Sequence, residues 1–206
     1  VWKESSPGSG AWSVEATLTG HRNWVNCVAV LADGRFVTGS WDSTVKVWKE
    51  SSTGSGMWSV EATLTGHNRH SSVFCVAVLA DGPTKVRLTT GSGDNTVKVW
   101  VEQGSTWSVE ATLTGHGGVV SCVAVLADGR FVTGSEDNTV KVWKESSTSP
   151  GTWSVEATLT GHSDDVNCVA VLPDASTGEP RLVTASSDYT VKVWVEQGST
   201  WSVEAT

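Results

Sequence analysis

The sequence has few basic residues, few cysteines and no long apolar run. It contains 14 lysines and arginines against 22 aspartates and glutamates, and its formal net charge is −8. A protein that binds nucleic acid or a membrane surface needs a basic footprint, so we expect no nucleic acid and no membrane among its partners. No apolar run approaches the roughly 20 residues that a membrane-spanning helix requires.

Four cysteines are too few, and too regularly placed, for a disulfide framework. Each falls in the same four-residue frame, CVAV, at Cys27, Cys75, Cys122 and Cys168. A repeat holds equivalent positions apart, so we expect neither disulfides nor a cysteine-ligated metal. We predict that the four thiols are small apolar core residues. Their free state favours an intracellular, reducing compartment.

What the sequence does have is repetition. WSVEATLTGH occurs verbatim at 12–21, 58–67, 107–116 and 153–162, and its final histidines are 46, 49 and 46 residues apart. A unit of this length accommodates about four short strands with turns. VNCVAVL suits a strand buried on both faces, whereas WSVEATL alternates as a half-exposed strand does. No helical period is present, so we predict an all-β protein.

Each repeat therefore reads as a four-stranded antiparallel sheet. In the first repeat we place strand a at 25–31, strand b at 35–40, strand c at 44–48 and strand d at 58–64. One such sheet cannot bury both of its faces, so the copies are expected to stack. The loops alternate in length between odd and even copies, which suggests a duplicated pair of repeats.

Three residues stand at fixed points of each copy: the histidine of TGH, an aspartate in the b–c turn and a tryptophan that ends strand c. With these residues the chain resembles the WD-repeat β-propeller family. The aspartate that often follows this tryptophan is absent, as in Trp48-Lys49. The resemblance covers almost the whole chain and implies one array of four blades over residues 1–206. Their expected bounds are a lead-in d strand at 12–18, then blades at 24–64, 72–113, 119–159 and 165–206.

The resemblance also implies a buried hydrogen-bond chain of aspartate, histidine, threonine and tryptophan in every blade. Asp, His and Thr outline a nucleophile triad as well. However, a single active site would not recur in each blade, and the indole N–H would cap the hydroxyl that an enzyme needs. We predict a structural network and no catalytic residues. Its members are Asp42, His21, Thr38 and Trp48; Asp94, His67, Thr90 and Trp100; Asp137, His116, Thr133 and Trp143; and Asp188, His162, Thr184 and Trp194.

The copies differ mainly in one region. Residues 12–57 and 107–152 have the same length and differ at nine positions only, six of which lie in the d–a and b–c connections or at the start of strand a. In a propeller these connections emerge on one rim, which we call the top face. Exposed strand positions such as Arg35 are unchanged. The candidate binding residues on this face are Arg22, Asn23, Trp24, Asn26, Trp41, Arg69, His70, Phe74, Gly93, Glu136, Asp164, Asp165, Ser187 and Tyr189.

The function expected from this pattern is non-catalytic binding of a protein or peptide of mixed charge on the top face. One alternative is an engineered or recently amplified repeat protein with no selected ligand. Another is a sensor fragment of a larger multidomain signalling protein. An enzyme or a small-ligand lectin has no supporting motif, because no Cys/His/carboxylate cluster has metal spacing and no glycine-rich phosphate loop precedes a helix. No metal and no cofactor is therefore expected.

Four blades are few for a closed ring. They would each have to turn by about 90°, whereas eight blades turn by about 45° each. We therefore expect a homodimer that completes an eight-bladed ring around a two-fold axis. The chain has five d strands for four sets of a, b and c strands. We expect strand 12–18 to cross to blade 4 of the second copy and to compete there with WSVEAT at 201–206.

Overall fold

The computed structural model describes residues 1–52, 54–79, 85–172, 180–198 and 200–206. These residues form strands and no helix, as predicted. Four sheets have four strands each, and a fifth sheet has two. Within the described part of the chain, no helix is long and apolar enough to cross a membrane.

Each four-stranded sheet takes its strands in chain order and pairs them antiparallel, which confirms the predicted blade. The strands follow the expected order a, b, c and d, and their ends differ from the predicted bounds by two residues or fewer in blade 1. Blade 1 consists of β3 (Val25–Val30), β4 (Phe36–Ser40), β5 (Thr44–Glu50) and β6 (Trp58–Thr65), and blade 2 of β7 (Val73–Leu79), β8 (Arg87–Ser92), β9 (Val97–Gln103) and β10 (Thr106–Leu113). Blade 3 consists of β11 (Val120–Val125), β12 (Phe131–Ser135), β13 (Val140–Glu145) and β14 (Trp153–Leu159), and blade 4 of β15 (Val166–Leu172), β16 (Arg181–Ser186), β17 (Val191–Gln197) and β18 (Thr200–Ala205).

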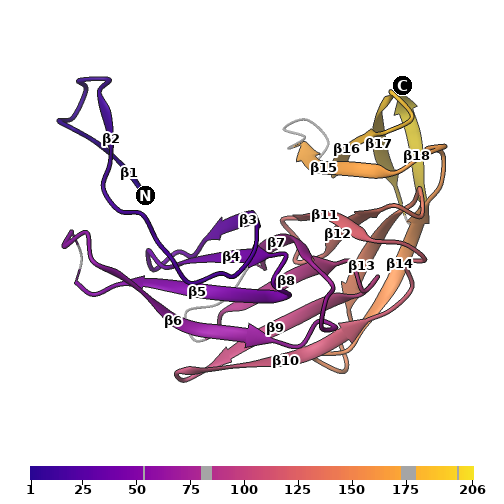
Figure 1. The fold of residues 1–206 in the computed structure, drawn as a ribbon. Helices are drawn as coiled ribbons and strands as arrows, with labels where there is room; N and C mark the ends of the chain where they lie inside the picture. Colours follow the sequence, from indigo (N-terminus) through magenta and orange to yellow (C-terminus); the bar gives the residue numbers. More distant parts are fainter. Residues whose placement is uncertain (53, 80–84, 173–179, 199) are drawn as a thin grey trace.

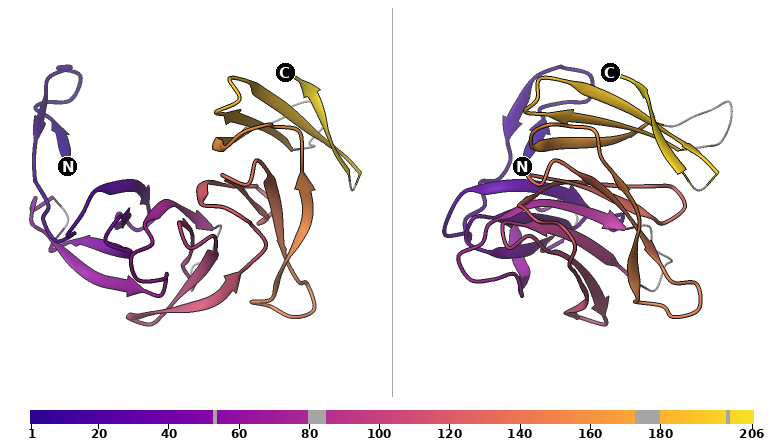
Figure 2. Two further views of the ribbon diagram at one scale, coloured as in Figure 1. Left: turned by 45° about the vertical axis from the view of Figure 1, so that its right-hand side comes forward. Right: turned by 90° about the vertical axis from the view of Figure 1, so that its right-hand side faces the viewer.

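The four blades stand side by side along an arc whose two ends do not meet (Figure 1; Figure 2, left). The a strands β3, β7, β11 and β15 pack against one another in that order, and each also contacts the neighbouring blade's b strand where one precedes it. Blade n therefore has a leading face, which packs on blade n+1, and a trailing face, which packs on blade n−1.

The core consists of three clusters, each lying between two successive blades. Between blades 2 and 3, for example, Val97 and Val99 of the leading face pack with Val120, Phe131 and Trp143 of the trailing face. The clusters between blades 1 and 2 and between blades 3 and 4 use the equivalent residues. The hydrophobic stabilisation of each blade therefore depends on its neighbours.

This arrangement corrects two sequence-based predictions at the ends of the arc. Strand β3 was expected to be buried on both faces, but Val25 and Val28 are 54% and 64% exposed, because no blade precedes blade 1. The cysteines were all expected in the core, and only Cys75 and Cys122 are buried. Cys27 is half-buried. Cys168 is exposed, because no blade covers the leading face of blade 4 in the part of the chain that the structure describes. All four are free thiols.

A glycine in each of the first three b strands marks the closest approach between blades. A Cβ at Gly91 would lie 2.5 Å from Val120 Cγ1 of blade 3 and 2.6 Å from Cys75 Sγ. The same holds at Gly39 and Gly134, each against the first valine of the next blade's a strand. These glycines are required by space and have ordinary backbone angles.

The N-terminal segment differs from the predicted lead-in strand. Strand β2 covers Trp12–Val14 only, and it pairs with β1 (Trp2–Glu4) in a separate hairpin rather than with a blade. WSVEAT at 201–206 forms most of β18, the fourth strand of blade 4, and its competition with strand 12–18 of a second copy stays a prediction. The sequence signal was available: residues 1–4, VWKE, repeat the end of strand c at 47–50, and the β1–β2 hairpin has the order of a c–d hairpin.

Candidate binding face

In every blade the predicted aspartate, histidine, threonine and tryptophan are joined by hydrogen bonds. In blade 3, His116 Nδ1 lies 2.8 Å from Asp137 Oδ2, and His116 Nε2 lies 2.8 Å from Thr133 Oγ1. Trp143 Nε1 donates to the same Thr133 oxygen at 2.8 Å. In the other blades the corresponding distances run from 2.7 to 3.0 Å.

The available protons determine the direction of these hydrogen bonds. An indole N–H can only donate, so Thr133 Oγ1 accepts from Trp143 and donates its own proton to His116 Nε2. The neutral imidazole then donates from Nδ1 to Asp137. Burial lowers the pKa of His116 and so favours the neutral ring, although Asp137 opposes this shift. The Thr133 side chain is fully buried, and its hydroxyl has no proton free for catalysis.

The aspartate also joins the two connections on which the copies differ. Asp137 Oδ2 accepts from the backbone N–H of Gly117 in the d–a connection, at 2.8 Å. Its Oδ1 accepts from the backbone N–H and the hydroxyl of Thr139 in the b–c turn, at 3.0 and 2.6 Å. Burial disfavours the charge, but these hydrogen bonds and the one from His116 outweigh it and lower the pKa of Asp137 to about 2. The constant network thus positions the variable residues.

Three aromatic side chains gather on the top face at blades 1 and 2. The ring centroids of Trp24 and Trp41 are 4.5 Å apart, and those of Trp41 and Phe74 are 6.3 Å apart. Trp24 and Trp41 are 67% and 37% exposed. At Gly93, which occupies the position of Trp41 in blade 2, a Cβ would meet the Phe74 ring at 3.4 Å. Phe74 of blade 2 thus lies beside Gly93 and reaches Trp41 of blade 1, and we call Trp24, Trp41 and Phe74 the aromatic cluster.

The opposite end of the top face is acidic. Glu136 of blade 3 occupies the position of Trp41, and its pKa is raised by burial and by the charge of Asp165 in blade 4. Asp165 O accepts from the backbone N–H of Ser187 at 2.9 Å, which joins the d–a connection of blade 4 to its b–c turn. Asp164 is exposed beside them. We call Glu136, Asp164 and Asp165 the acidic cluster.

The remaining candidates lie around these two clusters. The side chains of Arg22, Asn23, Arg69 and His70 are exposed. Asn26 is exposed too, but its Nδ2 donates to Val73 O of blade 2 at 3.2 Å, so it contributes to a contact between blades. Tyr189 is 100% exposed and its backbone φ is +66°. Large aromatic residues rarely adopt this left-handed conformation.

The face opposite the top face carries a row of arginines, of which Arg35 was predicted to be an exposed strand position. The guanidinium of Arg35 donates to both carboxylate oxygens of Glu102 in blade 2, at 2.6 and 2.7 Å. The Arg35 side chain is only 11% exposed. Arg87 and Arg130 bind Glu145 and Glu196 of the following blades in the same way. The invariance of Arg35 therefore has a structural reason. The signal was one arginine at or just before the start of each strand b and one glutamate near the end of each strand c.

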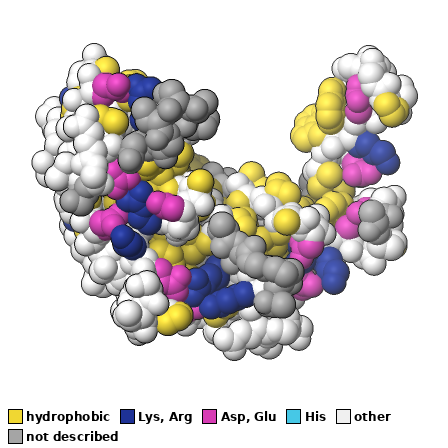
Figure 3. Space-filling view, turned by 180° about the vertical axis from the view of Figure 1, so that it is seen from behind, with side chains coloured by type: hydrophobic (Ala, Val, Ile, Leu, Met, Phe, Trp, Pro, Cys, Tyr) yellow, Lys and Arg dark blue, Asp and Glu magenta, His cyan; other side chains and the backbone are white. Residues whose placement is uncertain are grey.

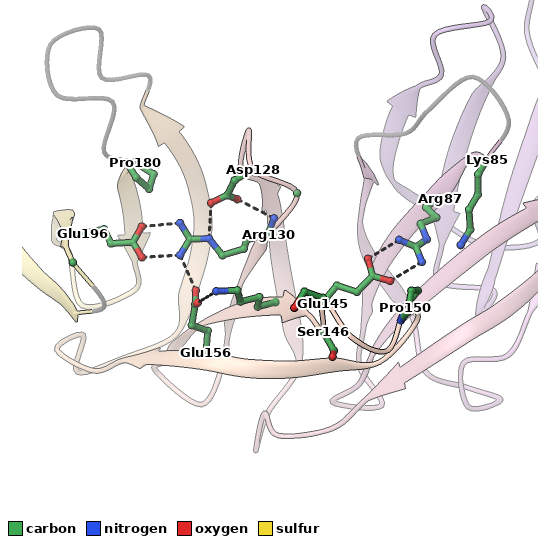
Figure 4. A pocket seen from close by; sticks show the side chains of 14 residues that line it. Lys85, Arg87, Asp128, Arg130, Glu145, Ser146, Pro150, Glu156, Pro180 and Glu196 are labelled. Atoms are coloured by element: carbon green, nitrogen blue, oxygen red, sulfur yellow. Dashed lines mark hydrogen bonds and ion pairs between the residues drawn. The ribbon is translucent and has the colours of Figure 1, made fainter.

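The Arg87–Glu145 and Arg130–Glu196 pairs line a groove of about 990 Å³ beneath blades 2, 3 and 4 (Figure 4). Basic and acidic side chains lie next to one another along this face of the arc (Figure 3). Since Arg87 and Arg130 are already bound to glutamates, the groove holds a structural ion-pair network. Among the described residues no group of three or more histidines, cysteines and acids is placed to hold a metal ion.

The comparison with family models matches these features. The model described as "WD domain, G-beta repeat" matches residues 12–49, 58–101, 107–144 and 153–195. A search of curated proteins gave no match. The four matched segments cover most of the chain, and each contains one complete Asp–His–Thr–Trp network. The chain therefore belongs to the WD-repeat family, whose repeats form the blades of β-propellers.

Proposed function

We propose that this chain is a non-catalytic scaffold that binds a protein or peptide on its top face. WD repeats are generally protein-interaction scaffolds. The observation that carries the proposal is the aromatic cluster, because Trp24 and Trp41 stay exposed at positions where the copies of the blade differ. Exposed tryptophan that is held by a rigid support suits the anchor of a binding hot spot.

The charge of the same face supports a partner of mixed character. Arg22 and Arg69 flank the aromatic cluster, whereas the acidic cluster lies two blades away. A suitable ligand has an apolar or aromatic anchor for Trp24 and Trp41, and basic residues farther along for Glu136 and Asp165. Such complementarity contributes specificity and association rate more than affinity.

The proposal is tested by selecting peptides from a random library on the wild-type chain and measuring their affinity for variants. Replacing both Trp24 and Trp41 with alanine is expected to weaken binding by about 30-fold or more, as loss of a hot spot does. Lys49→Ala, an exposed change on the opposite face, is the matched control. Unchanged affinity of the double variant, with the thermal melting point also unchanged, would show that the ligand does not use this face.

The other interpretations predict different results. If the chain is an engineered or recently amplified array with no selected ligand, any selected peptides will bind weakly and without preference for the aromatic cluster. If it is the sensor of a larger signalling protein, the top face binds as proposed. If it is an enzyme, the wild-type chain should show catalytic turnover and the Thr133→Val variant should show none, since this variant removes the hydroxyl of the blade 3 network.

We also propose that the four blades are half of an eight-bladed ring that a second copy completes. The open arc, with one uncovered blade face at each end, supports this arrangement (Figure 2).

A further inference from the structure

The two ends of the arc carry the two halves of the interface that joins its blades. On the leading face of blade 4, Val191 is 52% exposed, whereas its equivalents Val45, Val97 and Val140 are at most 1% exposed. Leu172, on the same face, is 37% exposed, against 2% for Leu126. These exposed positions have one structural explanation, which is the missing next blade.

The trailing face of blade 1 shows the complementary exposure. Val25 is 54% exposed, and its equivalents Val73, Val120 and Val166 are fully buried beneath the preceding blade. The residues that cover those valines in the three internal interfaces have counterparts on blade 4, where Ala185 replaces the glycine and Val191 and Leu172 are exposed. Soluble monomers rarely expose large contiguous apolar patches, so the exposed valines and leucine at both ends favour a covering partner.

The ion pairs between blades extend the same pattern. In each internal interface, the arginine at the start of strand b binds the glutamate near the end of the next blade's strand c, as Arg87 binds Glu145. The series leaves one arginine and one glutamate at the two ends. Arg181 of blade 4 contacts Glu204 of its own blade, and Glu50 of blade 1 has no preceding blade.

Glu50 shares one backbone contact with its equivalent in blade 3. Glu145 Oε1 accepts from Gly151 N–H while both of its oxygens bind Arg87. Glu50 Oε1 likewise accepts from Gly56 N–H at 2.7 Å, and its Oε2 accepts from Gly54 N–H at 3.0 Å in the same c–d loop. The loop therefore restrains the Glu50 side chain before docking, and Oε2 exchanges the Gly54 contact for the arginine of the second copy.

We propose that the leading face of blade 4 docks on the trailing face of blade 1 of a second copy, and that Arg181 binds Glu50 of that copy. Two such contacts, related by a two-fold axis, close eight blades into a ring. This contact rests on the eight-bladed ring proposed above and is independent of any ligand on the top face.

The β1–β2 hairpin has to leave the trailing face of blade 1 when the second copy docks. Glu15, next to β2, lies against Gly56 of blade 1 as Glu110 of blade 2 lies against Gly151 of blade 3. The hairpin thus occupies the outer margin, where strands β17 and β18 of the second copy would lie. Trp2 and Trp12 are 66% and 63% exposed, so the hairpin buries little apolar surface there and is displaced at low cost.

One residue makes the new contact differ from the internal ones. Blade 4 has Ala185 where the other three blades have the glycine of closest approach. Its methyl group must be accommodated against Val25 of the second copy, so this interface is expected to be slightly wider. Ala185→Gly should therefore tighten the dimer.

The test uses charge reversal at both ends. Wild-type chain should sediment at about twice 21.7 kDa, and Arg181→Glu and Glu50→Arg should each weaken self-association about tenfold or more. A one-to-one mixture of the two variants should recover the wild-type dissociation constant, because the mixed dimer contains one reversed and one original ion pair. Lys49→Glu, next to Glu50 and 59% exposed, is the control.

Each other outcome overturns part of the proposal. A wild-type mass of 21.7 kDa at all concentrations would exclude the contact. A dimer that ignores charge reversal would place the interface elsewhere, and a mass that grows beyond two copies would exclude the closed ring. Because the mixture must recover association, misfolding of a single variant is recognised directly.

Discussion

Blades 1 and 3 have almost the same sequence and different surroundings. Their equivalent valines Val25 and Val120 are 54% and 0% exposed, and their cysteines Cys27 and Cys122 are half-buried and buried. Local pattern therefore determines the strands and turns of a blade, whereas its place in the array determines which of its residues form a core. Matched substitutions in the two blades separate these contributions.

The largest difference is expected for a charge on the trailing face. Val120→Asp places a carboxylate in the cluster between blades 2 and 3 and should cost about 4 kcal/mol or more, or prevent folding. Val25→Asp lies at the open end and should cost less than about 1 kcal/mol in the monomer. Urea unfolding at low protein concentration measures both. Equal losses would mean that the trailing face of blade 1 is covered within the chain.

A second comparison concerns the hydrogen-bond network. His116→Ala removes the imidazole that joins Asp137 to the buried Thr133. This change should lower the free energy of unfolding by roughly 3 kcal/mol. His21→Ala should cost somewhat less, because Thr38 is 8% exposed and water can replace the lost partner. Thermal melting of the two variants checks the order. No loss at either site would contradict a structural role for the network.

Acid should test the same network through Asp137. Its pKa is lowered from 3.8 to about 2 in the folded chain, so the unfolded chain binds the proton more tightly. The stabilisation is complete above about pH 4 and is lost as the pH falls toward 2. Allowing for solvent screening, it amounts to about 1 kcal/mol. Asp137→Asn should remove this part of the pH dependence between pH 4 and 2, and an unchanged acid profile would contradict it.

The smallest effect is expected at the b–c turn. Asn138 of blade 3 and Tyr189 of blade 4 both have φ of +66°, a conformation that asparagine tolerates far better than tyrosine. Tyr189→Asn should stabilise the chain by about 0.5–1 kcal/mol, and Asn138→Tyr should destabilise it by a similar amount. If Tyr189 contacts the ligand, the stabilised variant should also bind more weakly.

The repeat made the blades predictable, since strand order, turns and the Asp–His–Thr–Trp set recur at fixed spacing. The ion pairs between blades were not recognised, because Arg35 and Glu102 belong to different copies and a single repeat shows each as an ordinary surface charge. The aromatic cluster was predicted only as separate residues. The contact of Phe74 with Trp41, beside Gly93, is a matter of packing across two blades that a single repeat does not show.

The close approach at Gly39, Gly91 and Gly134 also sets how sharply the chain turns from blade to blade. Since the next valine lies within 2.5–2.7 Å of where a Cβ would be, any side chain there has to push the inner edges of two sheets apart. Wider inner spacing reduces the rotation per blade, and a smaller rotation requires more blades to complete a full turn. The number of blades in a closed ring is therefore governed in part by a single hydrogen atom on each b strand.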